Sequence, residues 1–155
     1  ADCSKIKKFL VEDTTMAKMI KMTFERGGEI YAELQENAAP HIVEKFCKTL
    51  PITYPMLHGR YAGPAMFFNT SFDNVEEENM VSRKYVGMMT MTLGNKNHPQ
   101  HAVHVFYSYK RPIESSNNEI HLAQIPAKYF DKLEEIGDRV WGHCPENVTI
   151  ELVEE

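Results

Sequence analysis

The chain has 155 residues, 43% apolar and 25% charged, which is typical of one globular domain and unlike disordered, collagenous or coiled-coil chains. Its 17 Lys and Arg against 22 Asp and Glu give a net charge of −5, so no basic excess suggests nucleic acid as a partner. No apolar run approaches the roughly 20 residues of a membrane span, so we expect no membrane association.

The first residues and the cysteines bear on the compartment. Residues 1–17 are polar and weakly patterned, and we expect an N-terminal arm or a short helix there. They lack the basic start, apolar stretch and cleavage site of a secretory signal. Cys3, Cys47 and Cys144 are odd in number and widely spaced, so we expect neither a disulfide framework nor a CxxC zinc site. We therefore expect a cytoplasmic protein.

The first predicted elements are two strands and a helix. Apolar and polar residues alternate over 19–25 and over 29–35, which predicts half-buried strands. Gly27 and Gly28 supply the turn that joins them into a hairpin. Asn37 as N-cap, with Pro40 in the first turn, then predicts a helix that ends near residue 51.

Further short strands and a second helix follow. Strands are predicted at 54–62, 65–69, 88–93, 102–109, 119–125 and 148–152. The polar segment 70–86 is either a solvated loop or a lid. Pro126 opens the second helix, and Gly137 ends it.

About eight short strands with short connections favour antiparallel neighbours. Closure into a barrel removes the exposed sheet edges. We therefore predict a mainly β protein with a closed eight-stranded antiparallel barrel over residues 18–155, capped by two helices.

Several segments resemble the cyclophilin-like superfamily. They are Lys21–Glu25, Gly28–Leu34, Ala38–Pro40, Val43–Phe46 and Leu57–Phe67. The segment Leu133–Trp141 resembles a bacterial branch of small cyclophilin-like proteins of unassigned function. The resemblance covers about residues 19–153 and implies the barrel. It places Arg60 at the position of the cyclophilin active-site arginine and Met66 at that of a pocket methionine, while Phe68 replaces an expected glutamine.

Two side chains of one predicted strand could carry chemistry. His58 and Arg60 share parity and so a face. Histidine can move protons near neutral pH, and arginine binds carboxylates bidentately. The alternative is an ordinary solvated strand face.

A histidine-rich segment, 98–104, could suggest a metal. His101 and His104 have opposite parity on a strand, however, and no HExxH motif accompanies them, so we expect no metal and no cofactor. We expect His101 at a pocket rim and His104 facing away from the valine core, toward a ligand groove. Tyr107 alternates in step with the valines, so we expect its side chain to point into the core, unless its hydroxyl reaches a rim.

The expected site is therefore catalytic His58, Arg60 and His104, with Met66, Phe68, His101 and Tyr107 binding substrate. Three functions remain open. The first is a cofactor-independent small-molecule enzyme for a carboxylate-bearing substrate. A similar fold is associated with cucumopine synthase, which implies an opine-type Pictet–Spengler condensation of an amino acid with a 2-oxo acid. The others are a non-catalytic module that binds a small molecule or a protein, and a peptidyl-prolyl isomerase. A homo-oligomer is an open alternative to a monomer.

Overall fold

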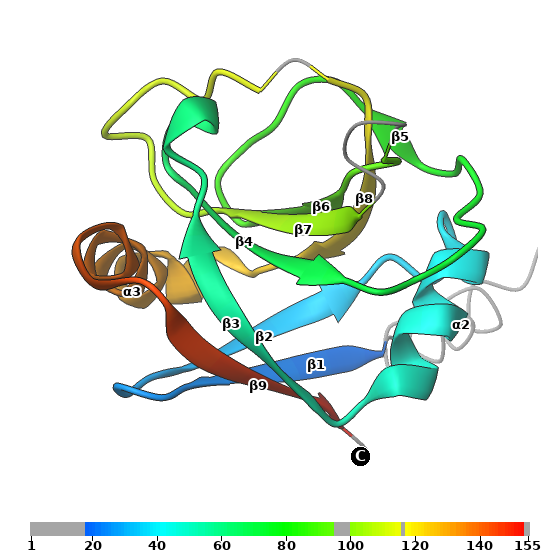
Figure 1. Ribbon diagram of the computed structural model, residues 1–155, viewed down its shortest axis with the longest axis horizontal. Coiled ribbons are helices and arrows are strands. Elements are labelled where there is room, and N and C mark those ends of the chain that lie inside the picture. The colour runs from blue at the N-terminus through cyan, green and yellow to red at the C-terminus, as the bar shows by residue number, and fades with distance from the viewer. Residues whose placement is uncertain (1–17, 95–99, 116, 154–155) are drawn as a thin grey trace, which may run out of the picture.

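The computed structural model describes residues 18–94, 100–115 and 117–153 (Figure 1). The predicted N-terminal arm over 1–17, the turn around 95–97 and His98 lie outside the described residues. The strands are β1 (Met19–Phe24), β2 (Glu29–Leu34), β3 (Ile52–His58), β4 (Ala65–Thr70), β5 (Met80–Val81), β6 (Met88–Met91), β7 (His101–Phe106), β8 (Glu119–Gln124) and β9 (Glu146–Val153). The helices are α2 (Pro40–Thr49) and α3 (Phe130–His143), with 3₁₀ turns η1 (Arg60–Ala62) and η2 (Ala127–Tyr129).

Eight of the strands close into an antiparallel barrel, as predicted. Their order around the ring is β2-β1-β9-β3-β4-β7-β6-β8, and β8 returns to β2 through two residue pairs. The short β5 adds to the free part of the β8 edge. The last strand, β9, lies between β1 and β3 and pairs with both along most of its length.

The barrel interior is filled with apolar side chains. The alternation that predicted the first hairpin buries Ile20, Met22 and Phe24 on β1, and β2 buries its own alternate residues in the same way. Met66 and Met89 are also fully buried, so these methionines serve as core filler. The helices lie at two separate places on the barrel, α3 beside β3 and β4, and α2 on the other side (Figure 1).

Three predicted element boundaries are wrong. The strand predicted over 54–62 ends at His58, and the chain turns into η1, so Arg60 is not on the strand. The first helix is not capped by Asn37: its N-cap is Ala39, and the Glu78 carboxylate accepts a hydrogen bond from the Ile42 amide at 2.7 Å. That carboxylate reaches the helix from the polar segment 70–86, which packs along α2.

The third correction concerns Gly137, which does not end the second helix. Helix α3 continues through it to His143. A Cβ at this position would lie 2.2 Å from a ring carbon of Tyr107, so the glycine is required by close packing rather than by a helix end.

Among the described residues, no helix combines the length and the apolar character needed to cross a bilayer.

Candidate functional site

The two predicted catalytic histidines, His58 and His104, lie on opposite faces of the sheet. His58 pairs with Met66, which pairs with Val105, and cross-strand partners share a face. These three side chains therefore belong to the interior face of the barrel. His104 pairs with Phe67 on the outer face. The expected outward direction of His104 relative to the valine core is confirmed, and His58 is on the other side.

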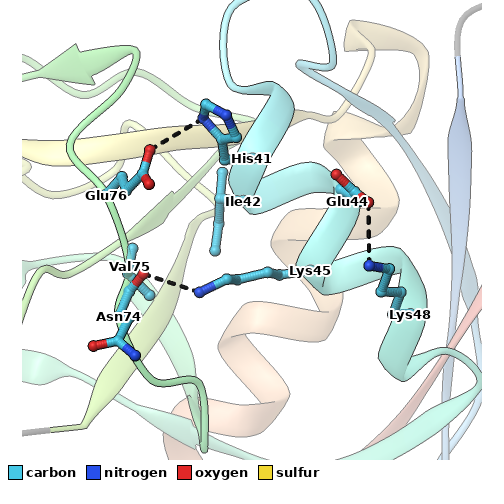
Figure 2. Close-up of a pocket in the computed structure, with 8 residues that line it drawn as sticks. All are labelled: His41, Ile42, Glu44, Lys45, Lys48, Asn74, Val75 and Glu76. Atoms are coloured by element: carbon cyan, nitrogen blue, oxygen red, sulfur yellow. Dashed lines mark hydrogen bonds and ion pairs between the residues drawn. The ribbon is translucent and has the colours of Figure 1, made fainter.

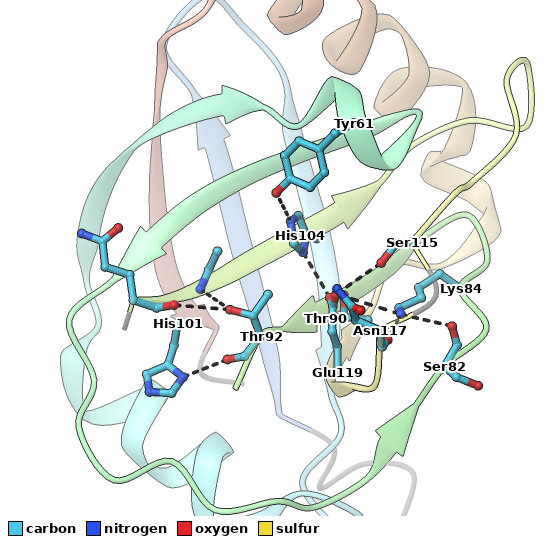
Figure 3. Close-up of polar contacts among 12 residues, drawn as sticks. Tyr61, Ser82, Lys84, Thr90, Thr92, His101, His104, Ser115, Asn117 and Glu119 are labelled. Atoms are coloured by element: carbon cyan, nitrogen blue, oxygen red, sulfur yellow. Dashed lines mark hydrogen bonds and ion pairs between the residues drawn. The ribbon is translucent and has the colours of Figure 1, made fainter. Parts of the chain in front are cut away.

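A network of polar side chains surrounds His104 on the outer face (Figure 3). We call it the outer-face cluster; it comprises Tyr61, Lys84, Thr90, His104, Ser115 and Glu119. Strands β6, β7 and β8 contribute Thr90, His104 and Glu119, and the remaining members come from η1 and from the connecting segments. Three adjacent strands thus bring together residues that are far apart in the sequence.

Glu119 is the centre of this cluster. Its Oε1 lies 3.1 Å from His104 Nδ1 and accepts a hydrogen bond from the Thr90 hydroxyl at 2.7 Å. Its Oε2 accepts a hydrogen bond from the Ser115 hydroxyl at 3.3 Å. On the far side of the imidazole, the Tyr61 hydroxyl lies 3.3 Å from His104 Nε2. The result is a continuous chain of hydrogen bonds from Tyr61 to Glu119.

A buried lysine completes the cluster. The Lys84 side chain is 0% exposed, and its Nζ lies 4.0 Å from Glu119 Oε2. It donates hydrogen bonds to the carbonyl oxygens of Ser82, at 3.1 Å, and of Asn117. Burial lowers the pKa of the Lys84 ammonium, against the opposing effect of the Glu119 charge.

These contacts determine the charge of Glu119 and the tautomer of His104. Burial alone raises the pKa of the Glu119 carboxyl, but the hydrogen bonds from His104 and Thr90 and the positive charge of Lys84 outweigh it and hold that pKa below its ordinary value. An ionised carboxylate only accepts hydrogen bonds. His104 Nδ1 therefore carries a proton, and in the neutral ring Nε2 is free to accept one from Tyr61.

A second group, the Trp141 cluster, lies where α3 meets β3 and the segment that follows β7. It comprises His58, Arg60, Tyr107, Arg111 and Trp141. The Arg111 guanidinium carbon stands 3.8 Å from the centre of the indole ring, and that of Arg60 stands 4.9 Å away. Arg60 also donates a hydrogen bond to the Trp141 carbonyl at 2.7 Å. We predicted that His58 and Arg60 share one face of a strand. In the structure both side chains instead contact Trp141, and Arg60 lies in η1.

His58 is held in its neutral form. Burial, together with the nearby charges of Arg111 and Arg60, lowers the pKa of the His58 imidazole to about 4. Its Nε2 lies 2.7 Å from the hydroxyl of Tyr107, which also accepts a hydrogen bond from Arg111 at 3.1 Å. Tyr107 is fully buried, so its hydroxyl reaches His58 and no exposed rim.

Two residues expected to bind substrate belong to the core. Met66 and Phe68 are both 0% exposed and point into the barrel, where Phe68 stacks on Tyr54 with 4.6 Å between ring centroids. The residue between them, Phe67, faces outward and lies 5.9 Å from the His104 ring. Because side chains alternate along β4, the outer face takes Phe67 where the sequence suggested Phe68.

His101 is buried at the start of β7 rather than exposed on a rim. Its Nδ1 lies 2.8 Å from the Thr92 carbonyl oxygen (Figure 3). Its own carbonyl accepts a hydrogen bond from the Thr70 hydroxyl at 2.5 Å. It joins neighbouring strands and is separate from the outer-face cluster. The described residues include no group of three His, Cys, Asp or Glu side chains arranged to hold a metal ion.

The sequence reasoning missed Tyr61, Lys84 and Glu119. Glu119 carried a weak signal, because a carboxylate opens an otherwise apolar strand segment. Lys84 carried none, since it lies in a polar segment that reads as solvated. Trp141 of the second cluster is brought to His58 by the packing of α3, and Arg111 lies in the segment that follows β7.

A shallow pocket of about 170 Å³ lies between α2 and the segment 74–76 (Figure 2). The charged side chains that line it already have partners: His41 contacts Glu76, and Lys48 contacts Glu44. None of the residues that line the pocket belongs to the outer-face cluster, and we assign it no role.

Comparison with known proteins identifies the fold. No protein-family model matches the chain, and no curated protein matches its sequence. Among solved structures, that of McbB in complex with tryptophan matches 85% of this chain with a TM-score of 0.69 at 16% identity. The solution structure of the hypothetical protein AF2241 from Archaeoglobus fulgidus matches 87% of this chain and 94% of its own, with a TM-score of 0.55 at 18% identity. This chain spans 44% of the length of McbB. The comparisons thus support the small barrel fold predicted from the sequence, which this chain shares with both proteins.

Proposed function

We propose that this protein is a cofactor-independent enzyme that performs acid–base chemistry on a small carboxylate-bearing substrate at the outer-face cluster. The observation that carries the proposal is the buried pair of His104 and Glu119, which are 3% and 2% exposed. Burying an ionised carboxylate is costly unless it is paired and hydrogen-bonded, and this one has Thr90, Ser115 and His104 as partners. Such a pair is suited to taking up a proton, because the imidazolium that forms is stabilised by the carboxylate.

The charge pattern around η1 favours an anionic substrate. Arg60 and Tyr61 are successive residues of η1, and their side chains reach the Trp141 cluster and the outer-face cluster respectively. Arg60 is exposed, so its guanidinium can form the two parallel hydrogen bonds that a carboxylate accepts. A substrate carboxylate bound by Arg60 would therefore lie next to Tyr61, the residue whose hydroxyl faces His104.

The comparison with McbB supports a small organic substrate, since that protein shares the fold and its structure was solved with tryptophan. We propose an amino acid as one substrate and a 2-oxo acid as the other, joined by an opine-type Pictet–Spengler condensation. Such a reaction needs a proton removed and returned at fixed positions while the reactants are held together. The substrates supply the amine and the ketone, so no cofactor is required.

The test is a direct search for product. The protein is incubated with tryptophan or histidine together with 2-oxoglutarate, and new masses are sought by mass spectrometry. We expect a condensation product that forms at least 100-fold more slowly with His104→Gln or Glu119→Gln. His41→Gln is the matched control, because His41 is an exposed histidine of α2, and it should keep wild-type activity.

Other outcomes would distinguish the alternatives. Arg60→Gln should raise KM for the carboxylate-bearing substrate more than it lowers kcat, since its role is binding. Binding of tryptophan or histidine, seen as a thermal shift, without any product over the whole panel would refute catalysis and favour a binding module. Activity that survives Glu119→Gln unchanged would exclude the outer-face cluster as the site.

A further inference from the structure

Tyr61 is the most exposed member of the outer-face cluster. Its side chain is 73% exposed, whereas His104 and Glu119 are almost completely buried. Both nitrogens of the His104 ring are already within hydrogen-bonding distance of a partner, Nδ1 with Glu119 and Nε2 with the Tyr61 hydroxyl. Any proton that passes between a substrate and His104 in this structure must therefore pass through the Tyr61 oxygen.

The turn that carries Tyr61 is held firmly from both ends. The Ala62 amide donates to the Gly59 carbonyl at 2.9 Å, and the Glu114 amide donates to the Ala62 carbonyl at 3.1 Å. Gly63 follows with φ of +90°, and a Cβ there would lie 2.2 Å from the Pro112 carbonyl oxygen. Only glycine fits this position, so the segment containing Pro112 packs directly against η1.

The phenol ring is also positioned by its neighbours. Tyr61 meets the His104 ring edge to face, with 6.4 Å between centroids and 79° between planes. A ring carbon of Tyr61 lies 3.6 Å from the place that a Cβ on Gly59 would take, so the ring packs beside Gly59. Tyr61 is largely exposed, while its hydroxyl points toward the imidazole (Figure 3).

We propose that Tyr61 is the catalytic residue that exchanges the proton with the substrate, relayed by His104 and stabilised by Glu119. In the forward step the substrate loses a proton from an ammonium group or an acidic carbon to the Tyr61 oxygen. The Tyr61 hydroxyl proton moves at the same time to His104 Nε2. The products are the deprotonated substrate and an imidazolium paired with the Glu119 carboxylate, and the reverse transfer returns the proton later in the reaction.

This assignment rests on the proposed function and sharpens its substrate class. The reacting group must be able to lose and regain one proton at a phenol oxygen, and it must lie near an anionic group within reach of Arg60. An amino acid whose amine has condensed with a ketone meets both conditions. A substrate that reacts by nucleophilic displacement on an enzyme side chain does not.

The experiment has one arm that does not depend on turnover. Two-bond ¹H–¹⁵N NMR of the histidine rings, with His104 identified from the His104→Gln variant, reports which nitrogen carries the proton. We expect His104 protonated at Nδ1 only, and we expect Tyr61→Phe to move the Nε2 resonance because it removes the donated hydrogen bond. Protonation at Nε2, or an Nε2 resonance that Tyr61→Phe leaves in place, would overturn the relay.

The kinetic arm uses the same variant, which keeps the aromatic ring and removes only the hydroxyl. We expect Tyr61→Phe to lower kcat about 100-fold with little change in KM. Tyr109→Phe is the matched control, an exposed tyrosine outside the cluster, and it should keep wild-type kcat. Wild-type kcat in Tyr61→Phe, combined with loss in His104→Gln, would overturn the assignment of Tyr61 while leaving the proposed function standing. A wild-type protein without turnover would refute the proposed function, and the NMR result would still decide the relay.

Discussion

Replacing Gly137 by alanine tests whether the packing of α3 on the barrel has been understood. In an open helix interior, Gly→Ala stabilises a protein by about 1 kcal/mol. At Gly137, however, the new methyl would lie 2.2, 2.3 and 2.6 Å from three carbons of the Tyr107 ring. Ordinary carbon–carbon contacts are about 3.5–4.0 Å, so ring or helix must move by roughly 1 Å or more.

The Tyr107 ring has little freedom to move. It is fully buried, and its hydroxyl is hydrogen-bonded to His58 and Arg111. Overpacking of a tight core costs about 1–3 kcal/mol and can exceed that where neighbours are fixed. We therefore expect Gly137→Ala to lower the free energy of unfolding by about 2 kcal/mol after the helix-propensity gain is included. In a domain of this size that corresponds to a Tm lowered by about 4–8 °C.

Thermal and urea unfolding, followed by circular dichroism, measure the effect. The matched control is Gly142→Ala in the same helix, where a Cβ would have no heavy atom within 4 Å. That variant should be as stable as wild type or up to about 1 kcal/mol more stable. If Gly137→Ala is as stable as Gly142→Ala, the close approach of α3 to Tyr107 is refuted.

Three further predictions concern buried polar groups. Glu146→Gln should destabilise the protein by about 3 kcal/mol near neutral pH, because Arg139 loses the charge that it contacts through two hydrogen bonds at 2.8 and 2.6 Å. Burial alone raises the pKa of the Glu146 carboxyl, but the hydrogen bonds and charges of Arg139 and Arg26 lower that pKa overall. The ionised carboxylate therefore stabilises the folded state above the unfolded pKa of about 4.3, and this stabilisation is lost as the pH falls further. In unfolding experiments at acid pH, the difference in stability between Glu146→Gln and wild type should shrink. Folding lowers the pKa of His58 to about 4, so between about pH 6.5 and 4 His58 is protonated in the unfolded state and neutral in the folded state. Protonation then favours unfolding, and the free energy of unfolding should decrease with falling pH less steeply in His58→Gln than in wild type. Thr90→Val, nearly isosteric, should cost about 1.5–3 kcal/mol in urea unfolding by removing a buried hydrogen bond to a charged carboxylate, and a loss below about 0.5 kcal/mol would contradict that bond.

The barrel could be predicted from the sequence because its cause is local. Alternation of apolar and polar residues identifies a strand whose face is buried, and short connections favour antiparallel neighbours, so the segment Met19–Leu34 indicates its own structure. The prediction failed at Gly137, whose reason is tertiary. A glycine in a helix pattern reads as an end, and only the ring of Tyr107 packed against it explains why the helix continues.

The site could be predicted only in part, for a related reason. Parity along β7 correctly separated His104 from the valine core. The alternation of side chains along a strand gave the wrong direction for Arg60. The strand ends at His58, and the 3₁₀ turn that follows changes the direction of the next side chains. The partner of His104 is Glu119, which stands 3.1 Å away because β6 lies between their strands and pairs with both. Strand order and register decide such contacts, and neither can be predicted from the spacing of residues along the chain.

The position of β9 has a consequence for biosynthesis. Because β9 pairs with β1 on one side and with β3 on the other, both strands have an unpaired edge until residues 146–153 have left the ribosome. A nascent chain that already contains seven of the eight barrel strands therefore cannot close its ring. It exposes backbone donors and acceptors next to apolar side chains such as Ile20 and Met22, a combination that favours association with other chains. Folding of the barrel is thus expected to follow translation of β9, and a chaperone that shields strand edges should raise the yield of the folded protein.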